Sequence, residues 1–91
     1  MSTIEPKKEE KKKDKKKNSH VLLIHNDEVN TFDWVIESLV QICKHTPEQA
    51  EQCAMIAHNK GKCDVKEGEK ETLIQMKREL NNRHIEATVE N

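Results

Sequence analysis

The stretch HNDEVNTFDW, residues 25–34, crowds hydrogen-bonding side chains between an apolar run and the start of a helical pattern. Asn26 and Asp27 come directly after the apolar run, and their amide and carboxylate oxygens accept hydrogen bonds from neutral or charged donors. On composition alone this is a turn with a capping cluster, because Asn and Asp are common turn residues. A binding edge is the alternative, since a plain strand-to-helix connection needs only one turn former and one cap.

His58 is a further residue that could bind a hydrogen-bond donor, because a neutral imidazole nitrogen accepts. It directly follows Ala57, the last member of a stripe of small residues at helical spacing, which also contains Ala50, Cys53 and Ala54. His58 therefore borders the face of this helix that we expect to be buried. A surface histidine without a ligand is the plain alternative.

The cysteines and remaining histidines favour neither a metal site nor a nucleophile. Cys43, Cys53, His58 and Cys63, with His45 nearby, lack the paired ligands two to four residues apart that are typical of structural zinc. No cysteine-protease signature and no Gly-rich nucleophile turn occurs. We therefore expect three reduced cysteines in or near the core, no metal, no cofactor and no enzymatic activity.

Charge divides the chain into two parts. Residues 1–18 contain eight lysines and four acids, a net charge of +4, whereas residues 19–91 hold eight basic and thirteen acidic residues, a net charge of −5. The first part has too few apolar side chains to offset its ordering entropy, so we expect a disordered Lys-rich extension followed by one small domain. A nucleic-acid-binding arm is one alternative, and an interaction domain without a pocket is another. The interspersed acids, the lack of aromatic residues in the arm and the acidic domain all favour a tether without nucleic acid.

The hydrophobic pattern predicts the elements that position these side chains. Helical spacing of apolar residues alternates with short strand-like runs, and the expected order is β-α-α-β-α-β. This order favours an α+β fold in which three helices pack on a small antiparallel three-stranded sheet. The expected elements are a buried central strand at 20–25, helices at 31–45 and 46–61, a weak strand at 62–67, a helix at 69–83 and a half-exposed strand at 84–91.

Local signals define several helix ends. Asn30 or Thr31 is placed to cap the first helix through a short side-chain oxygen. Thr46 and Gln49 form a capping box at the start of the second helix. Gly61 should end that helix by adopting a left-handed conformation.

Hydropathy gives no sign of a membrane segment. No apolar run approaches the roughly 20 residues that span a bilayer. The basic beginning is not followed directly by a hydrophobic segment, so it does not have the pattern of a secretory signal. We therefore expect no membrane partner. We also expect a cytoplasmic protein and a monomer.

Three stretches of the sequence resemble the ClpS family: VLLIHNDEVNTFDWVIESLVQ, EQAEQCAMIAHNKGK and the closing HIEATVE. The resemblance covers roughly residues 20–91. Its most specific elements are Asn-Asp-acid after the first strand and the A-x-x-x-H-x-x-G pattern around His58. ClpS proteins are adaptors that recognise N-degrons, which are destabilising N-terminal residues. The resemblance thus implies binding of a free, bulky hydrophobic N-terminal residue and delivery of the protein to the N-terminal domain of a Clp-family AAA+ unfoldase and its peptidase.

The resemblance also assigns roles to particular residues. Matches to the family's contacts with the free α-amino group and first peptide unit are Asn26, Asp27 and His58. Matches to the rim and wall of the pocket for the first side chain are Glu28 at the rim and Asn30, Phe32, Val35, Ala54, Ala57 and Ile85 in the wall. Phe32 replaces the family's usual Met, while two alanines stand where Met and Val are frequent. The alanines predict a wider pocket unless Phe32 fills it.

Overall fold

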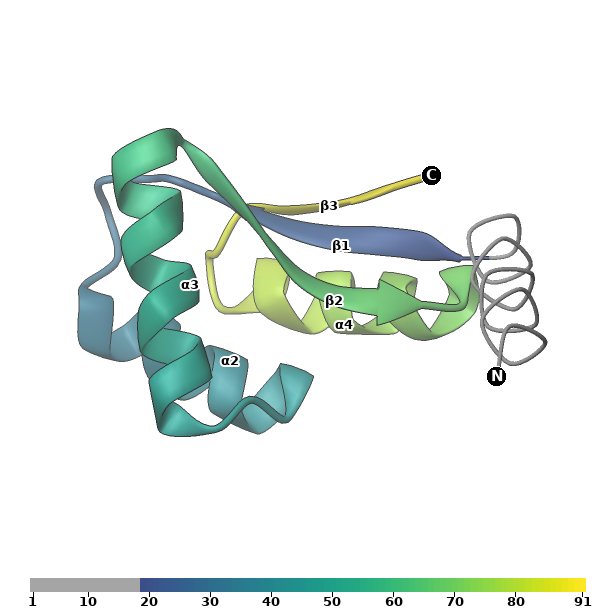
Figure 1. Cartoon of the computed structure of the whole chain (residues 1–91), viewed down its shortest axis with the longest axis horizontal. Coiled ribbons are helices and arrows are strands. Elements are labelled where there is room, and N and C mark those ends of the chain that lie inside the picture. The colour runs from purple at the N-terminus through teal and green to yellow at the C-terminus, as the bar shows by residue number, and fades with distance from the viewer. Residues whose placement is uncertain (1–18) are drawn as a thin grey trace, which may run out of the picture.

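The computed structural model describes residues 19–91, and the expected disordered extension at 1–18 lies outside this range. The element order is β-α-α-β-α-β, as the sequence predicts (Figure 1). The elements are β1 (His20–His25), α2 (Phe32–Cys43), α3 (Pro47–Lys60), β2 (Lys62–Gly68), α4 (Lys70–Asn82) and β3 (Ala87–Glu90).

The three strands form one antiparallel sheet in the order β2-β1-β3, so the predicted central position of β1 is confirmed. Leu22, Leu23 and Ile24 of this strand are all buried, as expected for the central strand of the sheet. The register against β2 shifts between Leu22 and Leu23, which leaves Val65 as an extra residue in β2. Such a bulge bends the strand and increases its twist.

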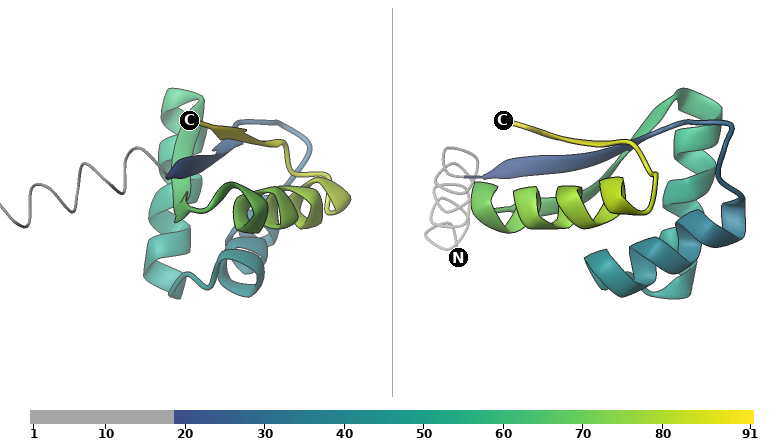
Figure 2. Two further views of the ribbon diagram at one scale, coloured as in Figure 1. Left: turned by 90° about the vertical axis from the view of Figure 1, so that its right-hand side faces the viewer. Right: turned by 180° about the vertical axis from the view of Figure 1, so that it is seen from behind.

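The helices surround one end and one face of the sheet (Figures 1 and 2). α4 runs along the strands, whereas α3 stands across the end of the sheet where β1 finishes and β2 begins. α2 lies below α3 and beside α4. The elements share a single apolar core, built mainly from Leu22, Ile24, Leu39, Ile42, Cys43, Ala50, Ala57, Cys63, Val65, Leu73, Leu80, Ile85 and Ala87.

The predicted ends of α3 are confirmed. The backbone N–H of Gln49 donates to the Thr46 hydroxyl at 3.1 Å, and the Thr46 N–H donates to the Gln49 side chain at 3.0 Å. Gly61 adopts a φ of 96° and its N–H donates to the Ala57 carbonyl at 2.8 Å. For α2, the structure selects Thr31 as the cap, since its hydroxyl accepts from the Trp34 N–H at 3.1 Å.

The last strand begins three residues later than the alternating pattern predicts. His84 has a φ of 69°, in the left-handed region, and its N–H donates to the Asn81 carbonyl at 2.9 Å. The N–H of Ile85 donates to the Leu80 carbonyl at 3.0 Å, so this segment wraps the end of α4 before β3 starts. Ile85 and Ala87 are nevertheless both buried, which preserves the alternation across the turn.

The three cysteines are free thiols. Burial raises the pKa of the Cys43 thiol to about 11 and that of the Cys63 thiol to about 12, because the uncharged form is favoured away from water. Within residues 19–91, His, Cys, Asp and Glu do not form a group of three or more suited to a metal ion. The helices of this range are also too short or too polar to cross a membrane.

Candidate functional site

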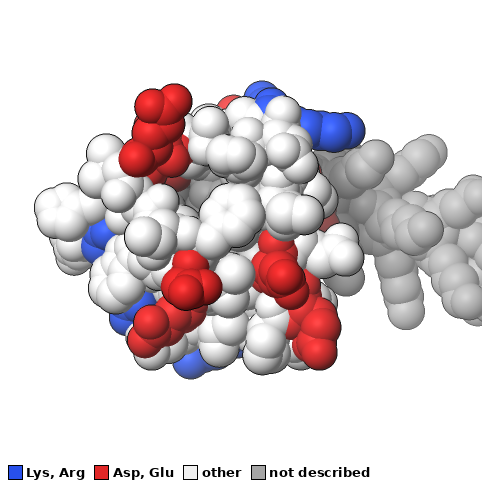
Figure 3. Space-filling model, turned by 90° about the vertical axis from the view of Figure 1, so that its left-hand side faces the viewer, with Lys and Arg blue, Asp and Glu red and all other residues white. Residues whose placement is uncertain are grey.

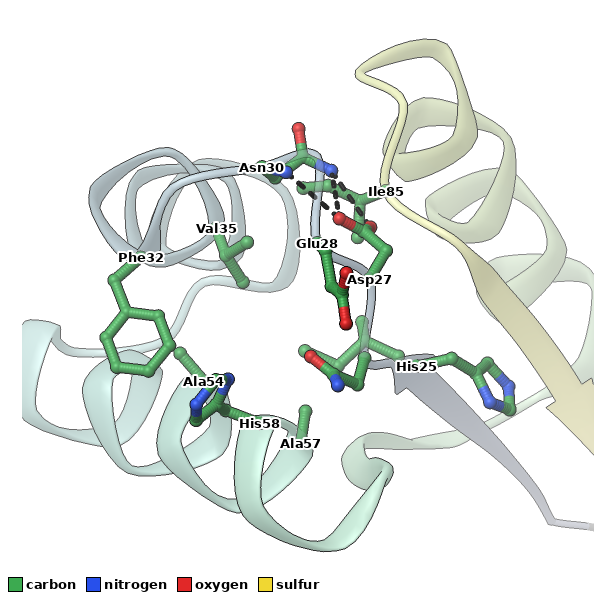
Figure 4. Close-up of a pocket in the computed structure, with 12 residues that line it drawn as sticks. His25, Asp27, Glu28, Asn30, Phe32, Val35, Ala54, Ala57, His58 and Ile85 are labelled. Carbon is green, nitrogen blue, oxygen red and sulfur yellow. Dashed lines mark hydrogen bonds between the residues drawn. The ribbon is translucent and has the colours of Figure 1, made fainter.

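A pocket of about 310 Å³ opens where the end of β1, the loop after it, α2 and α3 meet the segment before β3 (Figure 4). The fold gathers all ten predicted site residues around this one pocket, although they are spread from position 26 to position 85 of the chain. They are Asn26, Asp27, Glu28, Asn30, Phe32, Val35, Ala54, Ala57, His58 and Ile85.

The pocket is also lined by two residues that the sequence did not predict, Ile24 and His25. Both belong to the end of β1 and precede Asn26 directly, so their position beside the polar motif was the available signal. The His25 Nε2 atom lies 2.8 Å from the Thr88 hydroxyl in a hydrogen bond. This bond ties the end of β1 to β3.

Asp27 organises the loop between β1 and α2. Its Oδ1 atom accepts from the backbone N–H groups of Val29 and Asn30, at 2.9 and 3.0 Å. The Asn30 side-chain amide donates to Oδ1 at 3.2 Å and to Oδ2 at 2.9 Å. A carboxylate offers about four lone-pair positions on two oxygens, so Oδ2 retains capacity for another donor.

The same loop is attached to the turn before β3. The Asn30 side-chain amide donates to the His84 carbonyl at 2.7 Å. One turn into α2, the Trp34 indole N–H donates to the Arg83 carbonyl at 3.0 Å. One side chain from the loop and one from the first turn of α2 therefore satisfy two consecutive carbonyls of this turn.

Two other polar candidates meet where β1 and α3 end: Asn26 directly follows β1, and His58 lies in the last turn of α3. The backbone N–H of Asn26 donates to the Gly61 carbonyl at 2.8 Å, which brings the end of β1 against the residue that terminates the helix of His58. Within residues 19–91, the histidine rings that make hydrogen bonds are those of His25 and His45. The exposed His58 imidazole therefore keeps both nitrogens for a ligand.

The wall of the pocket is apolar. Ala54, Ala57 and Ile85 are buried and Val35 is half-buried, whereas Phe32 is 40% exposed. The Phe32 ring meets the His58 ring in a T-shaped contact, with 5.3 Å between centroids and an interplanar angle of 88° (Figure 4). A pocket with an apolar wall and hydrogen-bonding groups at its edge is typical of small-ligand and peptide sites.

The face that carries the site is acidic. Asp27 and Glu28 line the pocket itself. Figure 3 shows acidic side chains at the upper left and below the centre of one face of the molecule, while the lysines and arginines in view lie towards its edges. Negative charge around a recess with apolar walls favours a cationic ligand.

Comparison with known proteins places this chain in a family. A family model described as ATP-dependent Clp protease adaptor protein ClpS matches residues 15–88. The chain belongs to the ClpS family. The expected resemblance is thereby confirmed, and this ClpS chain belongs to a family of adaptors.

Two relatives of this ClpS chain agree with the assignment. The ATP-dependent Clp protease adapter protein ClpS of Nitratidesulfovibrio vulgaris is 32% identical over 40 residues, which cover 44% of this chain and 40% of that relative. A structure of Agrobacterium tumefaciens ClpS2 bound to L-phenylalaninamide matches with a TM-score of 0.77 at 16% identity, over 80% of this chain and 95% of that chain. The second likeness confirms the α+β fold predicted from the sequence.

The pocket of this ClpS chain stays open despite its aromatic replacement. Phe32 is part of the lining, and a pocket of about 310 Å³ remains with its ring in place. Ala54 and Ala57 present only methyl groups to this space. The opposite wall carries the branched side chains of Val35 and Ile85.

Proposed function

We propose that this ClpS adaptor binds proteins whose chain begins with a bulky hydrophobic residue carrying a free α-amino group. The observation that carries the proposal is the convergence of Asn26, Asp27 and His58 on one pocket whose wall is apolar. The three polar side chains would hold the α-amino group and the first peptide unit. The wall would hold the first side chain.

The chemistry of the α-amino group supports this assignment. The group titrates near pH 8 and is mostly cationic at neutral pH. The Asn26 amide oxygen, the Asp27 carboxylate and a neutral His58 nitrogen are acceptors for its three N–H bonds. An internal peptide bond offers one N–H and no charge, so it would leave acceptors unpaired, and a site built for hydrogen bonds rejects such a ligand strongly.

The apolar wall supplies the second part of the selectivity. Transferring a large hydrophobic side chain from water into such a pocket contributes about 1.5–3 kcal/mol. Neither part is sufficient alone, because a buried side chain can occur anywhere in a protein and every chain has an N-terminus. L-Phenylalaninamide, the compound bound to A. tumefaciens ClpS2, combines a free α-amino group with an aromatic side chain. It therefore has both features for which the pocket of the present chain is suited.

A peptide titration tests the proposal. Peptides beginning with Phe, Leu, Trp or Tyr would be measured by calorimetry in free and N-acetylated forms. We expect binding of the free forms and its loss on acetylation, since acetylation removes the positive charge and two of the three N–H donors. Equal affinity for the two forms would disprove the assignment. A peptide beginning with Asp serves as a control for side-chain selectivity and should not bind.

We further propose that the chain delivers its bound proteins to the N-terminal domain of a Clp AAA+ unfoldase, acting as a monomer in the cytoplasm. The Lys-rich residues 1–18 would take part in delivery. Deletion of residues 2–17 should leave peptide affinity unchanged and slow degradation of a reporter with an N-terminal Phe by the unfoldase and its peptidase. A truncated protein that delivers as well as the full chain would exclude this function of the extension.

A further inference from the structure

We propose that Phe32 is a positioning residue whose ring holds the His58 imidazole in the orientation needed at the pocket mouth. This inference rests on the proposed function and adds to it a specific interaction between two walls of the pocket. The recorded geometry is an edge-to-face pair, 5.3 Å between centroids and 88° between planes. Both values are typical of favourable aromatic contacts.

The place of Phe32 in α2 suits this function. It is the first residue of the helix, directly after the cap Thr31, whose hydroxyl is fixed by the Trp34 N–H. The backbone that carries the Phe32 ring is therefore well anchored. Yet the side chain is 40% exposed, so it does not contribute as a fully buried core residue would. Contact with His58 explains why a large aromatic side chain lies at this rim.

On the side that faces the pocket, the helix of His58 offers no long side chain to support the imidazole. Residues three and four positions apart are neighbours on a helix surface. Met55, three positions before His58, is not part of the pocket lining; on the pocket side the neighbour before His58 is Ala54, and the one after it is Gly61, which ends the helix. Neither has a side chain long enough to pack against the imidazole. The aromatic contact comes instead from Phe32 of α2, whose ring lies beside that of His58 (Figure 4).

An oriented imidazole matters for affinity. A free histidine side chain loses rotamer freedom when it binds a ligand, and that loss opposes binding. A ring already held by Phe32 has lost this freedom before the peptide arrives. A rotated imidazole would also move the accepting nitrogen away from the position of the α-amino group and first peptide unit.

Phe32 could instead serve only as apolar wall, and the two possibilities differ in their dependence on His58. A wall residue contributes through size, so Phe32→Leu would weaken binding by the same factor whether or not His58 is present. A positioning residue acts through His58, so its effect vanishes in the His58→Ala background. A double-mutant cycle measures this difference directly.

The experiment compares wild type, F32L, F32Y, H58A and the F32L/H58A double variant with a peptide beginning with Leu, by calorimetry. We expect F32L to weaken binding about two- to ten-fold, F32Y to weaken it less than F32L because it keeps the ring, and F32L to have no further effect on H58A. Additive losses in the double variant, or a loss in F32Y as large as that in F32L, would overturn the inference. Ile56→Leu is the matched control, since Ile56 is also 40% exposed and lies outside the pocket.

A second measurement needs no peptide and keeps this inference separate from the proposed function. Ring protons of His58 lie in the magnetic field of the Phe32 ring, so their NMR resonances should move in F32L and stay close to wild type in F32Y. Unchanged resonances in F32L would overturn the contact even if wild type binds peptides. Conversely, a wild type that binds free and acetylated peptides equally would disprove the proposed function while the resonances still report the ring pair.

Discussion

The carboxylate of Asp27 accepts four hydrogen bonds within its own loop, from the backbone of Val29 and Asn30 and from the Asn30 side chain. In the proposed function the same carboxylate also faces a cationic α-amino group. One residue thus shapes the site and supplies charge to it. These two contributions can be separated by substitution.

Asp27→Ala should lower both stability and affinity, whereas Asp27→Asn should lower mainly affinity. The alanine loses every loop hydrogen bond, at a cost of about 1–2 kcal/mol in the free energy of unfolding. The asparagine keeps an oxygen for the backbone N–H groups and removes the charge, although its NH2 group cannot accept from the Asn30 amide as Oδ2 does. Urea unfolding and calorimetric titration with a free N-terminal Phe peptide measure the two effects. An asparagine variant with wild-type peptide affinity would contradict the charge contribution.

Ala54 and Ala57 leave the pocket wide on the α3 side. Ala54→Met should fill part of this space and weaken binding of peptides beginning with Trp more than those beginning with Leu. Calorimetry with both peptides gives the ratio of affinities. Ile56→Met introduces the same side chain on the exposed side of α3 and should leave the ratio unchanged. A ratio unaffected by A54M would show that Ala54 does not limit the first side chain.

The sequence identifies most residues of the pocket but not how they interact. The Asn26-Asp27 motif and His58 can be recognised from the sequence, because each belongs to a family pattern that lies within one continuous stretch. The Phe32–His58 ring pair joins positions 26 residues apart through tertiary packing, and no local spacing predicts it. The Asn30 side chain was a candidate cap, but the amide instead reaches His84, a partner set by the whole fold.

At the scale of elements, the ends of α3 determine where the site lies. Gly61 ends the helix in a left-handed conformation, and its carbonyl accepts the Asn26 N–H. The helix terminus and the end of β1 are thereby joined next to His58. Backbone strain at Gly61 should therefore lower the free energy of unfolding and also disturb the pocket.

Gly61→Ala should lower the free energy of unfolding by about 1–2 kcal/mol, because the Cβ atom of an alanine disfavours a positive φ. The cost is purely conformational, since a methyl group at this position meets no atom within 4 Å. Gly68→Ala is the matched control: the added methyl is equally free of contacts and φ lies outside the left-handed region. Thermal or urea unfolding compares the two variants, and equal losses would contradict the explanation.

Element boundaries were predictable where the signal is local. The Thr46–Gln49 capping box and Gly61 each act within one helical turn, and both ends of α3 fall where the sequence places them. The start of β3 was not predictable in this way. Apolar alternation continues through Ile85, yet the chain turns at His84 because carbonyls of α4 and the side chains of Asn30 and Trp34 satisfy that segment.

For the molecule as a whole, the buried thiols link stability to pH. The pKa of Cys43 is raised from 9.0 to about 11 and that of Cys63 to about 12, mainly by burial. The unfolded chain therefore loses these protons near pH 9, while the folded chain holds them. The stabilising contribution is complete below pH 9 and is lost as the pH rises through about 11 and 12.

Urea unfolding between pH 8 and pH 11 checks this expectation, with wild type compared to Cys43→Ala. The variant lacks one buried thiol, so its free energy of unfolding should decline less steeply above pH 9 than that of wild type. A constant offset from the small cavity is expected at every pH and does not affect the slope. Parallel curves for the two proteins would contradict the linkage to Cys43.

The two hydrogen bonds from Asn30 and Trp34 to the turn before β3 join the pocket loop to the last strand. When either segment opens, the donors and carbonyls of both are released together. The pocket loop and β3 should therefore have the same free energy of local opening. Their amide protons should exchange with solvent as a single cooperative unit. Fraying of the carboxyl end of the chain would then reach the mouth of the pocket without passing through the central strand.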